Sequence, residues 1–329
     1  MRLALTLLMS AVVLGASQVS AGAWPPAEPP AQDASARLES LNALDQRVAR
    51  VAARLWSANA DLCPVQQRGA GWMLHAASLY SGELRPEAQR RWGLRGDLPG
   101  VLAAPAGTAA AEAGLRPGDL VLGVGDQQLA AGATGRQSYQ GFAANVLALD
   151  RALSRGPQAI NVQRGEQVLT LTVRPKPTCG YEVQLDPSSS LNAKADRRRV
   201  YLNTALAAFA QTDDELALVL AHELAHAVLR HRPWNDPETY GRTRNPAAPV
   251  QARLRDREAE ADRVGLWLLA RACYDPDVGP SFWRRFGAAN WQVRLPQIGH
   301  ASAGTRARAL EAVAAEISRR RQAGEPLLP

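Results

Sequence analysis

The apolar residues of this chain recur at helical spacing in three stretches. The first runs from Leu38 to Trp56, the second follows Thr212, and the third surrounds Val264. Apolar residues three or four positions apart lie on one face of an α-helix, so each stretch is expected to bury a face against a core. From about Gly96, between the first two stretches, short strands separated by Gly and Pro turns replace the helical pattern.

Part of this strand-rich region resembles a PDZ domain. Residues 114–122 (GLRPGDLVL) are similar to the PDZ signature in which a helix end turns into a buried strand. A hairpin is expected around Arg164 and Gly165, and a helix beside a peptide groove within residues 139–153. The resemblance places a carboxylate-binding loop at residues 99–102 and implies peptide capture by strand addition. The alternative is an unrelated small β-rich insert.

The second helical stretch contains the sequence AHELAH at positions 221–226. His222 and His226 are four residues apart, so they share a helical face and both imidazoles can reach one metal ion. Glu223 points to the same side, where it can take a proton from a water molecule and deliver it to a leaving amine. The chain holds five histidines, so a chance pattern of surface histidines is a weak alternative.

The residues around this motif predict where its helix begins and exclude one class of zinc peptidase, the metzincins. Residues 212–215 (TDDE) have the form of a capping box, which predicts the start of the helix. The positions where a metzincin has Gly and a third His hold Leu229 and Arg232, so a third ligand must come from elsewhere. His231 lies off the metal-binding face of a continuing helix, and we interpret it as an ordinary helix-end histidine.

The third helical stretch offers two carboxylates on one face. Glu258 and Asp262 are four residues apart, so one can complete a His₂Glu zinc site while the other hydrogen-bonds a ligating imidazole. The small residues Ala259, Ala261 and Gly265 would allow this helix to pack closely against a neighbour. The alternative, a solvated acidic face paired with arginines, would be favoured if the HExxH motif were absent.

These two motifs together resemble zinc metallopeptidase family M48. The similarity is strong over residues 180–315 and weak over residues 36–95. It implies a zinc ion held by His222, His226 and Glu258, with Asp262 supporting a ligand and Glu223 acting as general base.

The resemblance also suggests residues around the reaction centre. An edge strand would line the substrate cleft, and the candidate is the strand formed by Val200, Tyr201 and Leu202. His300 and Arg306 resemble a family loop; with Tyr240, they are candidates for stabilising the oxyanion. Alternatively, His300 could occupy the open metal position and inhibit the resting enzyme, or be structural.

The first 35 residues have the pattern of an exported protein. Arg2 precedes an apolar run that is too short for a confident membrane span, and small residues end at Ala21. We therefore expect residues 1–21 to be a signal peptide cleaved near Ala21, residues 22–35 to be a flexible leader, and the protein to reach a bacterial periplasm. Peripheral association with a membrane stays open.

The cysteines and the charge add less. Cys63 and Cys179 could form a disulfide in an oxidising compartment, and Cys273, at the end of an apolar helix, is expected to be a buried free thiol. The net charge is +7, but 36 of the basic residues are Arg and 2 are Lys, a skew that often reflects coding composition. No nucleic-acid motif accompanies it, so no nucleic-acid partner is expected.

The sequence therefore predicts an α+β protein with a mainly helical zincin core, a small sheet and an inserted β-rich, PDZ-like domain. Residues 36–95 and 176–329 would form the metallopeptidase, and residues 96–175 the insert. The expected function is zinc-dependent cleavage of envelope polypeptides that are misfolded or unassembled. The alternative is a periplasmic chaperone or adaptor that binds unfolded proteins with little proteolysis.

Overall fold

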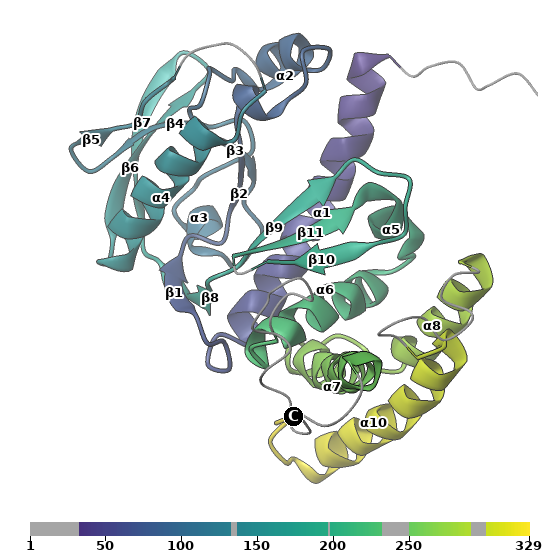
Figure 1. The fold of residues 1–329 in the computed structure, drawn as a ribbon. Coiled ribbons are helices and arrows are strands. Elements are labelled where there is room, and N and C mark those ends of the chain that lie inside the picture. Colours follow the sequence, from purple (N-terminus) through teal and green to yellow (C-terminus); the bar gives the residue numbers. More distant parts are fainter. Residues whose placement is uncertain (1–32, 133–136, 197, 232–249, 291–300) are drawn as a thin grey trace, which may run out of the picture.

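The computed structural model describes residues 33–132, 137–196, 198–231, 250–290 and 301–329, with backbone alone for 250–253. The fold class is α+β, as expected: a mainly helical core packs beside a β-rich lobe (Figure 1). The principal helices of the core are α1 (Ala34–Ala58), α5 (Thr204–Phe209), α6 (Asp213–Val228), α7 (Val250–Arg271), α8 (Val278–Ala289) and α10 (Ala303–Ala323). Among the described residues, no helix combines the length and apolar character needed to cross a bilayer.

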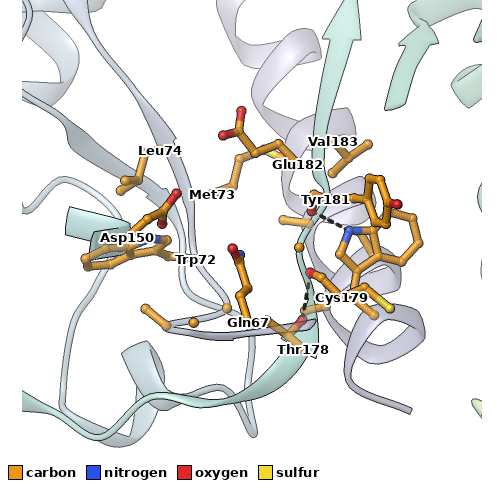
Figure 2. A pocket seen from close by; sticks show the side chains of 18 of the residues that line it. Gln67, Trp72, Met73, Leu74, Asp150, Thr178, Cys179, Tyr181, Glu182 and Val183 are labelled. Atoms are coloured by element: carbon orange, nitrogen blue, oxygen red, sulfur yellow. Dashed lines mark hydrogen bonds between the residues drawn. The ribbon is translucent and has the colours of Figure 1, made fainter. Parts of the chain in front are cut away.

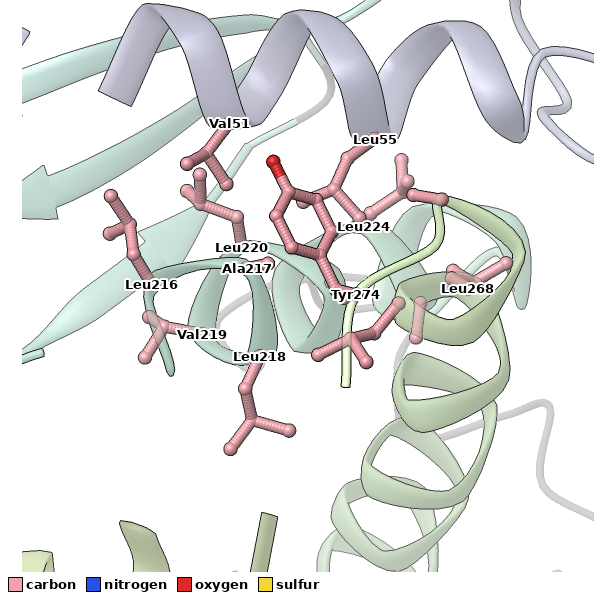
Figure 3. Packing of buried hydrophobic residues seen from close by; sticks show 14 of the residues in the cluster. Val51, Leu55, Leu216, Ala217, Leu218, Val219, Leu220, Leu224, Leu268 and Tyr274 are labelled. Carbon is pink, nitrogen blue, oxygen red and sulfur yellow. The ribbon is translucent and has the colours of Figure 1, made fainter. Parts of the chain in front are cut away.

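Helix α6 lies at the centre of this core. Its residues are buried without interruption from Glu215 to Ala221, which is typical of a helix surrounded by other elements on all sides. Figure 3 shows side chains of α1, α6 and α7 converging around Tyr274, with Leu55 and Leu224 fully buried nearby. Any residue of α6 is thus fixed in position by packing as well as by its helix.

The predicted capping box at the start of α6 is present. The Thr212 hydroxyl accepts a hydrogen bond from the Glu215 amide at 3.2 Å, and the Glu215 carboxylate accepts one from the Gln211 amide at 2.6 Å. Arg285 of α8 pairs with the same carboxylate at 2.6 Å. These contacts determine where α6 begins, and therefore which turn carries the HExxH motif.

A small sheet covers part of the core, and its strand order corrects one expectation. β11 (Arg199–Asn203) lies in the middle, antiparallel to β10 (Ala193–Ala195) and parallel to β9 (Glu182–Asp186). Val200, Tyr201 and Leu202 are therefore not an edge strand. The edge next to α6 is β10, whose three residues, Ala-Lys-Ala, are too few for a pattern from which a strand could be predicted.

The β-rich lobe is built on a second sheet. Its strands follow the order β2-β3-β4-β6-β7, with β5 beside β4. The expected hairpin is present, because β6 and β7 pair up to Arg164 and Gln167 and Gly165 has φ +58°. The strands are β2 (Met73–His75), β3 (Gly100–Ala103), β4 (Leu120–Val124), β5 (Gln127–Gln128), β6 (Gln158–Arg164) and β7 (Gln167–Val173). The helices are η1 (Ala77–Leu79), α2 (Arg85–Trp92), α3 (Ala109–Glu112) and α4 (Gln140–Ser154), the last where a groove helix was expected.

Two features of this lobe differ from the sequence-based expectation. Residues 99–102 are not a carboxylate-binding loop, because β3 lies buried between β2 and β4. The lobe also begins earlier than residue 96, since β2 and α2 belong to it. The sheet has β2 at one edge and β7 at the other, and β2 follows a loop containing Gly71 at φ +71°.

The lobe joins the core through a pair of strands and a disulfide. β1 (Gln66–Gly69) and β8 (Lys176–Cys179) run antiparallel, so the chain enters and leaves the lobe side by side. The disulfide between Cys63 and Cys179, which the sequence left open, is present and closes a sequence separation of 116 residues. Cys273, in contrast, is exposed rather than buried: α7 has ended at Arg271, and Cys273 adopts φ +57°, which turns its side chain outward.

Candidate metal centre

The close crossing of α6 and α7 creates the centre. A Cβ atom on Gly265 would lie 3.1 Å from the Ala221 carbonyl oxygen and from the backbone N and Cα of His222. Ala261, one turn earlier, is fully buried. Gly265 and Ala261 therefore allow the helix contact that the sequence predicted, and this contact brings the acidic face of α7 to the histidine face of α6. Ala259, which was also expected to pack against the neighbouring helix, is exposed.

Three donor groups meet at this crossing. The Nε2 atoms of His222 and His226 are 3.2 Å apart, and the Glu258 carboxylate oxygens lie 3.3 Å and 3.4 Å from them. A tetrahedral ion with ligand bonds of about 2.0–2.1 Å separates its ligand atoms by about 3.3–3.4 Å. The donor set, two imidazoles and one carboxylate, thus fits a zinc ion in both chemistry and spacing.

A buried ion pair between Asp262 and Arg306 contacts His222 at Nδ1, the ring nitrogen that does not face the other donor groups. Its Nδ1 lies 3.0 Å from Asp262, which accepts hydrogen bonds from Arg306 through both oxygens, one of them at 2.6 Å. Burial raises the pKa of Asp262, but the charge of Arg306 and the His222 hydrogen bond lower it to about 2. Asp262 is therefore ionised and accepts from Nδ1–H, which leaves Nε2 of His222 free to bind metal.

Besides Asp262, Arg306 has a second partner, the indole ring of Trp283. Its guanidinium carbon lies 3.3 Å from the ring centroid of Trp283 in α8, and the side chain is almost completely buried. Two of its nitrogens are engaged by Asp262. The structure thus brings Arg306 to the centre, as the sequence suggested, but on a carboxylate that supports His222.

Glu223 lies in the same turn of α6 as His222 and is 8% exposed. Burial raises its pKa above the ordinary value of a glutamate, although the nearby imidazoles oppose this effect. A raised pKa makes a carboxylate a stronger base, which suits the role of a general base.

His231 is closer to the centre than its sequence position suggested. Its Nδ1 lies 3.0 Å from Nδ1 of His226, and its Nε2 lies 3.5 Å from a carboxylate oxygen of Glu260. The interpretation of His231 as an ordinary helix-end residue is wrong, because α6 ends at Val228 and the chain turns back. The missed signal is a histidine five residues after His226, which can reach it through such a turn.

A cavity of about 160 Å³ opens beside the centre. Its walls include His222 and Glu223, and edge strand β10 contributes Ala193. The remaining walls are mostly apolar and come from α5, α6 and α8: Leu206, Leu218, Val219, Phe282, Trp283 and Phe286. An extended polypeptide beside β10 would therefore place one side chain in an apolar pocket next to Glu223.

His300 and Tyr240, two of the candidates for stabilising the oxyanion, lie outside the described residues.

Comparison with known proteins agrees with this chemistry. Residues 161–236 match the model of peptidase family M48, a segment that contains the HExxH motif and ends before Glu258. The mitochondrial metalloendopeptidase OMA1 of Schizosaccharomyces pombe is 31% identical over 29% of this chain and 34% of its own length. OMA1 of Saccharomyces cerevisiae is 28% identical over 35% of this chain and 38% of its own length. The chain thus spans about a third of these relatives, and the matches support a relationship to family M48.

Several solved structures are similar to part of the chain, among them a PDZ domain. The PDZ domain of HtrA3, bound to a phage-derived ligand, aligns with 34% of this chain and 89% of its own, at 17% identity and a TM-score of 0.24.

Proposed function

We propose that this protein is a zinc-dependent endopeptidase. The observation that carries the proposal is the triangle of His222, His226 and Glu258 donor atoms at zinc spacing, with the buried carboxylate of Glu223 in the same turn of α6 as His222. The family match and the two metalloendopeptidase relatives support the same activity.

Each residue has a separate task in this proposal. His222, His226 and Glu258 hold the metal, which when bound supplies Lewis acidity that activates water and polarises a carbonyl. Glu223 accepts the proton of the attacking water and returns it to the amine that leaves. Asp262, fixed by Arg306, keeps the His222 ring in the tautomer and orientation that ligation needs.

The substrate would lie along β10. As the edge strand nearest α6, β10 can pair with an extended polypeptide, and the apolar cavity beside Glu223 would receive a neighbouring side chain. This proposal replaces the strand of residues 200–202, which lies inside the sheet. It favours substrates with an apolar residue next to the cleaved bond.

The β-rich lobe offers a second place for a polypeptide. A cavity of about 160 Å³ lies between the lobe and the core, with β2 and α4 on one wall. Figure 2 shows Trp72, Leu74 and Asp150 on one side of it and Tyr181 and Val183 on the other. We infer that this PDZ-like lobe captures polypeptide at the β2 edge and thereby raises its concentration near the metal centre.

We further propose that the protein works in a bacterial periplasm on misfolded or unassembled envelope proteins. The disulfide between Cys63 and Cys179 supports an oxidising compartment. Residues 1–21, the expected signal peptide, lie outside the described part of the chain. Mass spectrometry of the exported protein should find an N-terminus near Gly22; an intact Met1 in the membrane fraction would contradict this.

The alternative is a chaperone or adaptor that binds unfolded proteins and rarely cleaves them. A single comparison decides between the two functions. Wild type and Glu223→Gln should both bind one zinc ion, because Glu223 is not a ligand, but casein degradation should fall at least about 100-fold in the variant. Glu258→Ala should lose metal and activity together, which controls for the assignment of the third ligand. Equal, slow degradation by wild type and Glu223→Gln would favour the chaperone.

A further inference from the structure

His231 contacts His226 on the side of the imidazole ring that faces away from the proposed metal. The Nε2 atom of His226 points to His222 and Glu258, at 3.2 Å and 3.4 Å. The other ring nitrogen, Nδ1, lies 3.0 Å from Nδ1 of His231. His231 is therefore placed where it can orient the His226 ring without occupying a metal position.

The end of α6 produces this contact. Arg230 adopts φ +56°, the Arg230 amide donates to the Ala227 carbonyl at 3.0 Å, and the His231 amide donates to the His226 carbonyl at 2.8 Å. These two bonds define a Schellman motif, which returns the chain over the last helical turn. In such motifs the residue after the left-handed one often packs on the residue five positions earlier. Here both residues are histidines.

We propose that His231 is a positioning residue that holds His226 through a relay ending on Glu260. This inference rests on the proposed metal site. A His226 ring that binds metal through Nε2 carries its hydrogen on Nδ1 and must donate it. His231 accepts through Nδ1, so its own hydrogen is on Nε2, which lies 3.5 Å from the Glu260 carboxylate. The hydrogen bond from His226 to His231 thus fixes both tautomers and leaves the Nε2–H group of His231 for the Glu260 carboxylate 3.5 Å away.

The relay explains why the two ligating histidines have different supports. His222 is backed directly by Asp262, whose side chain is 7% exposed, whereas Glu260 at the end of the relay is 40% exposed. A carboxylate placed directly behind His226 would be another charge buried beside Glu258, which costs free energy. An intervening neutral imidazole extends the support to a carboxylate that stays in contact with solvent.

The test compares zinc binding in three variants. His231→Leu keeps the bulk of the side chain but removes the acceptor, and zinc affinity should weaken about 10- to 100-fold. His231→Gln retains both functions, because its amide oxygen can accept from His226 and its NH₂ can donate to Glu260, so it should keep most of the affinity. Arg230→Gly preserves the turn with a residue suited to positive φ and should bind zinc like wild type.

Zinc dissociation constants from chelator competition give the primary measurement. The visible spectrum of the Co²⁺-substituted proteins gives a second one, and it should change in His231→Leu alone. Circular dichroism checks that each variant is folded. Wild-type affinity in folded His231→Leu, or equal losses in His231→Leu and His231→Gln, would overturn the relay. A wild-type protein that binds no zinc would instead contradict the proposed function.

Discussion

At the residue scale, two glutamates near the same helix crossing have opposite surroundings. The Glu258 carboxylate lies 3.3 Å and 3.4 Å from the Nε2 atoms of the two ligating imidazoles, and although burial raises its pKa, protonated imidazoles at these distances bring it far below the ordinary value. Glu223 is more deeply buried than Glu258, and burial is the dominant effect on its pKa, which is raised. Divergent pKa values in one site separate a permanent anion from a group that exchanges protons. This contrast supports Glu258 as ligand and Glu223 as base.

The raised pKa of Glu223 predicts a pH dependence. A general base acts in its ionised form, so activity should fall as the pH drops through the pKa of Glu223. Because burial raises that pKa, the fall should be centred above 4.5, the ordinary value of glutamate. The measurement is kcat/KM on a short peptide from about pH 3.5 to about pH 8, with metal content determined at each pH. A fall centred at or below the ordinary value, with metal still bound, would contradict the prediction.

At the element scale, the site depends on how closely α6 and α7 approach, because His222 and Glu258 come from different helices. Gly265→Ala should strain this contact, since the new Cβ would meet three backbone atoms at 3.1 Å. Overpacking costs about 1–3 kcal/mol, which exceeds the gain of about 1 kcal/mol from replacing a helical Gly by Ala. We expect lower stability in urea and weaker zinc binding.

The chain offers a matched control for this substitution. Gly304 also lies in a helix, α10, but a Cβ there would find only the end of the Arg308 side chain at 3.7 Å. Gly304→Ala should therefore leave zinc affinity unchanged and should not lower the midpoint of urea unfolding. If both variants behave alike, the close crossing is not what positions the ligands.

The sequence predicted those elements that have a strong local signal. The three amphipathic helices, the capping box at Thr212 and the small residues that let α7 approach α6 follow from spacing and side-chain size. The errors lie where tertiary structure decides. Strand β10 is only three residues long, Cys273 turns outward after its helix ends, and His231 reaches His226 because α6 stops at Val228. Helical geometry cannot predict contacts made beyond the end of a helix.

At the scale of the whole molecule, α1 joins the two lobes. Leu38 near its start packs in the β-rich lobe with Leu84 and Leu94, whereas Val51 and Leu55 near its end pack against α6 and α7. Gln46 between them donates to the Leu102 carbonyl of β3. The disulfide fastens the lobe at its other junction. The lobe is thus held at two separate places, which keeps its cavity at a fixed position relative to the core.

This arrangement defines how the lobe can be removed to test its role. Gly69 and Lys176 are paired across β1 and β8, so a short Gly-containing turn can replace residues 70–175 and leave the disulfide intact. Leu38 would then be exposed, and Leu38→Gln should accompany the deletion. The metal ligands all lie C-terminal to the excised residues, so the shortened protein should bind zinc.

The shortened protein should cleave short peptides at a rate within a few-fold of wild type but lose most of its activity on unfolded casein. Capture at the β2 edge raises the local concentration of a long chain near β10, and a peptide too short to reach both places gains nothing from it. The measurement is the ratio of kcat/KM values for the two substrates, after zinc content and circular dichroism have been checked. Leu38→Gln in the full-length chain controls for the accompanying substitution. Equal losses on both substrates would mean that the lobe supports the core structurally and does not capture substrate.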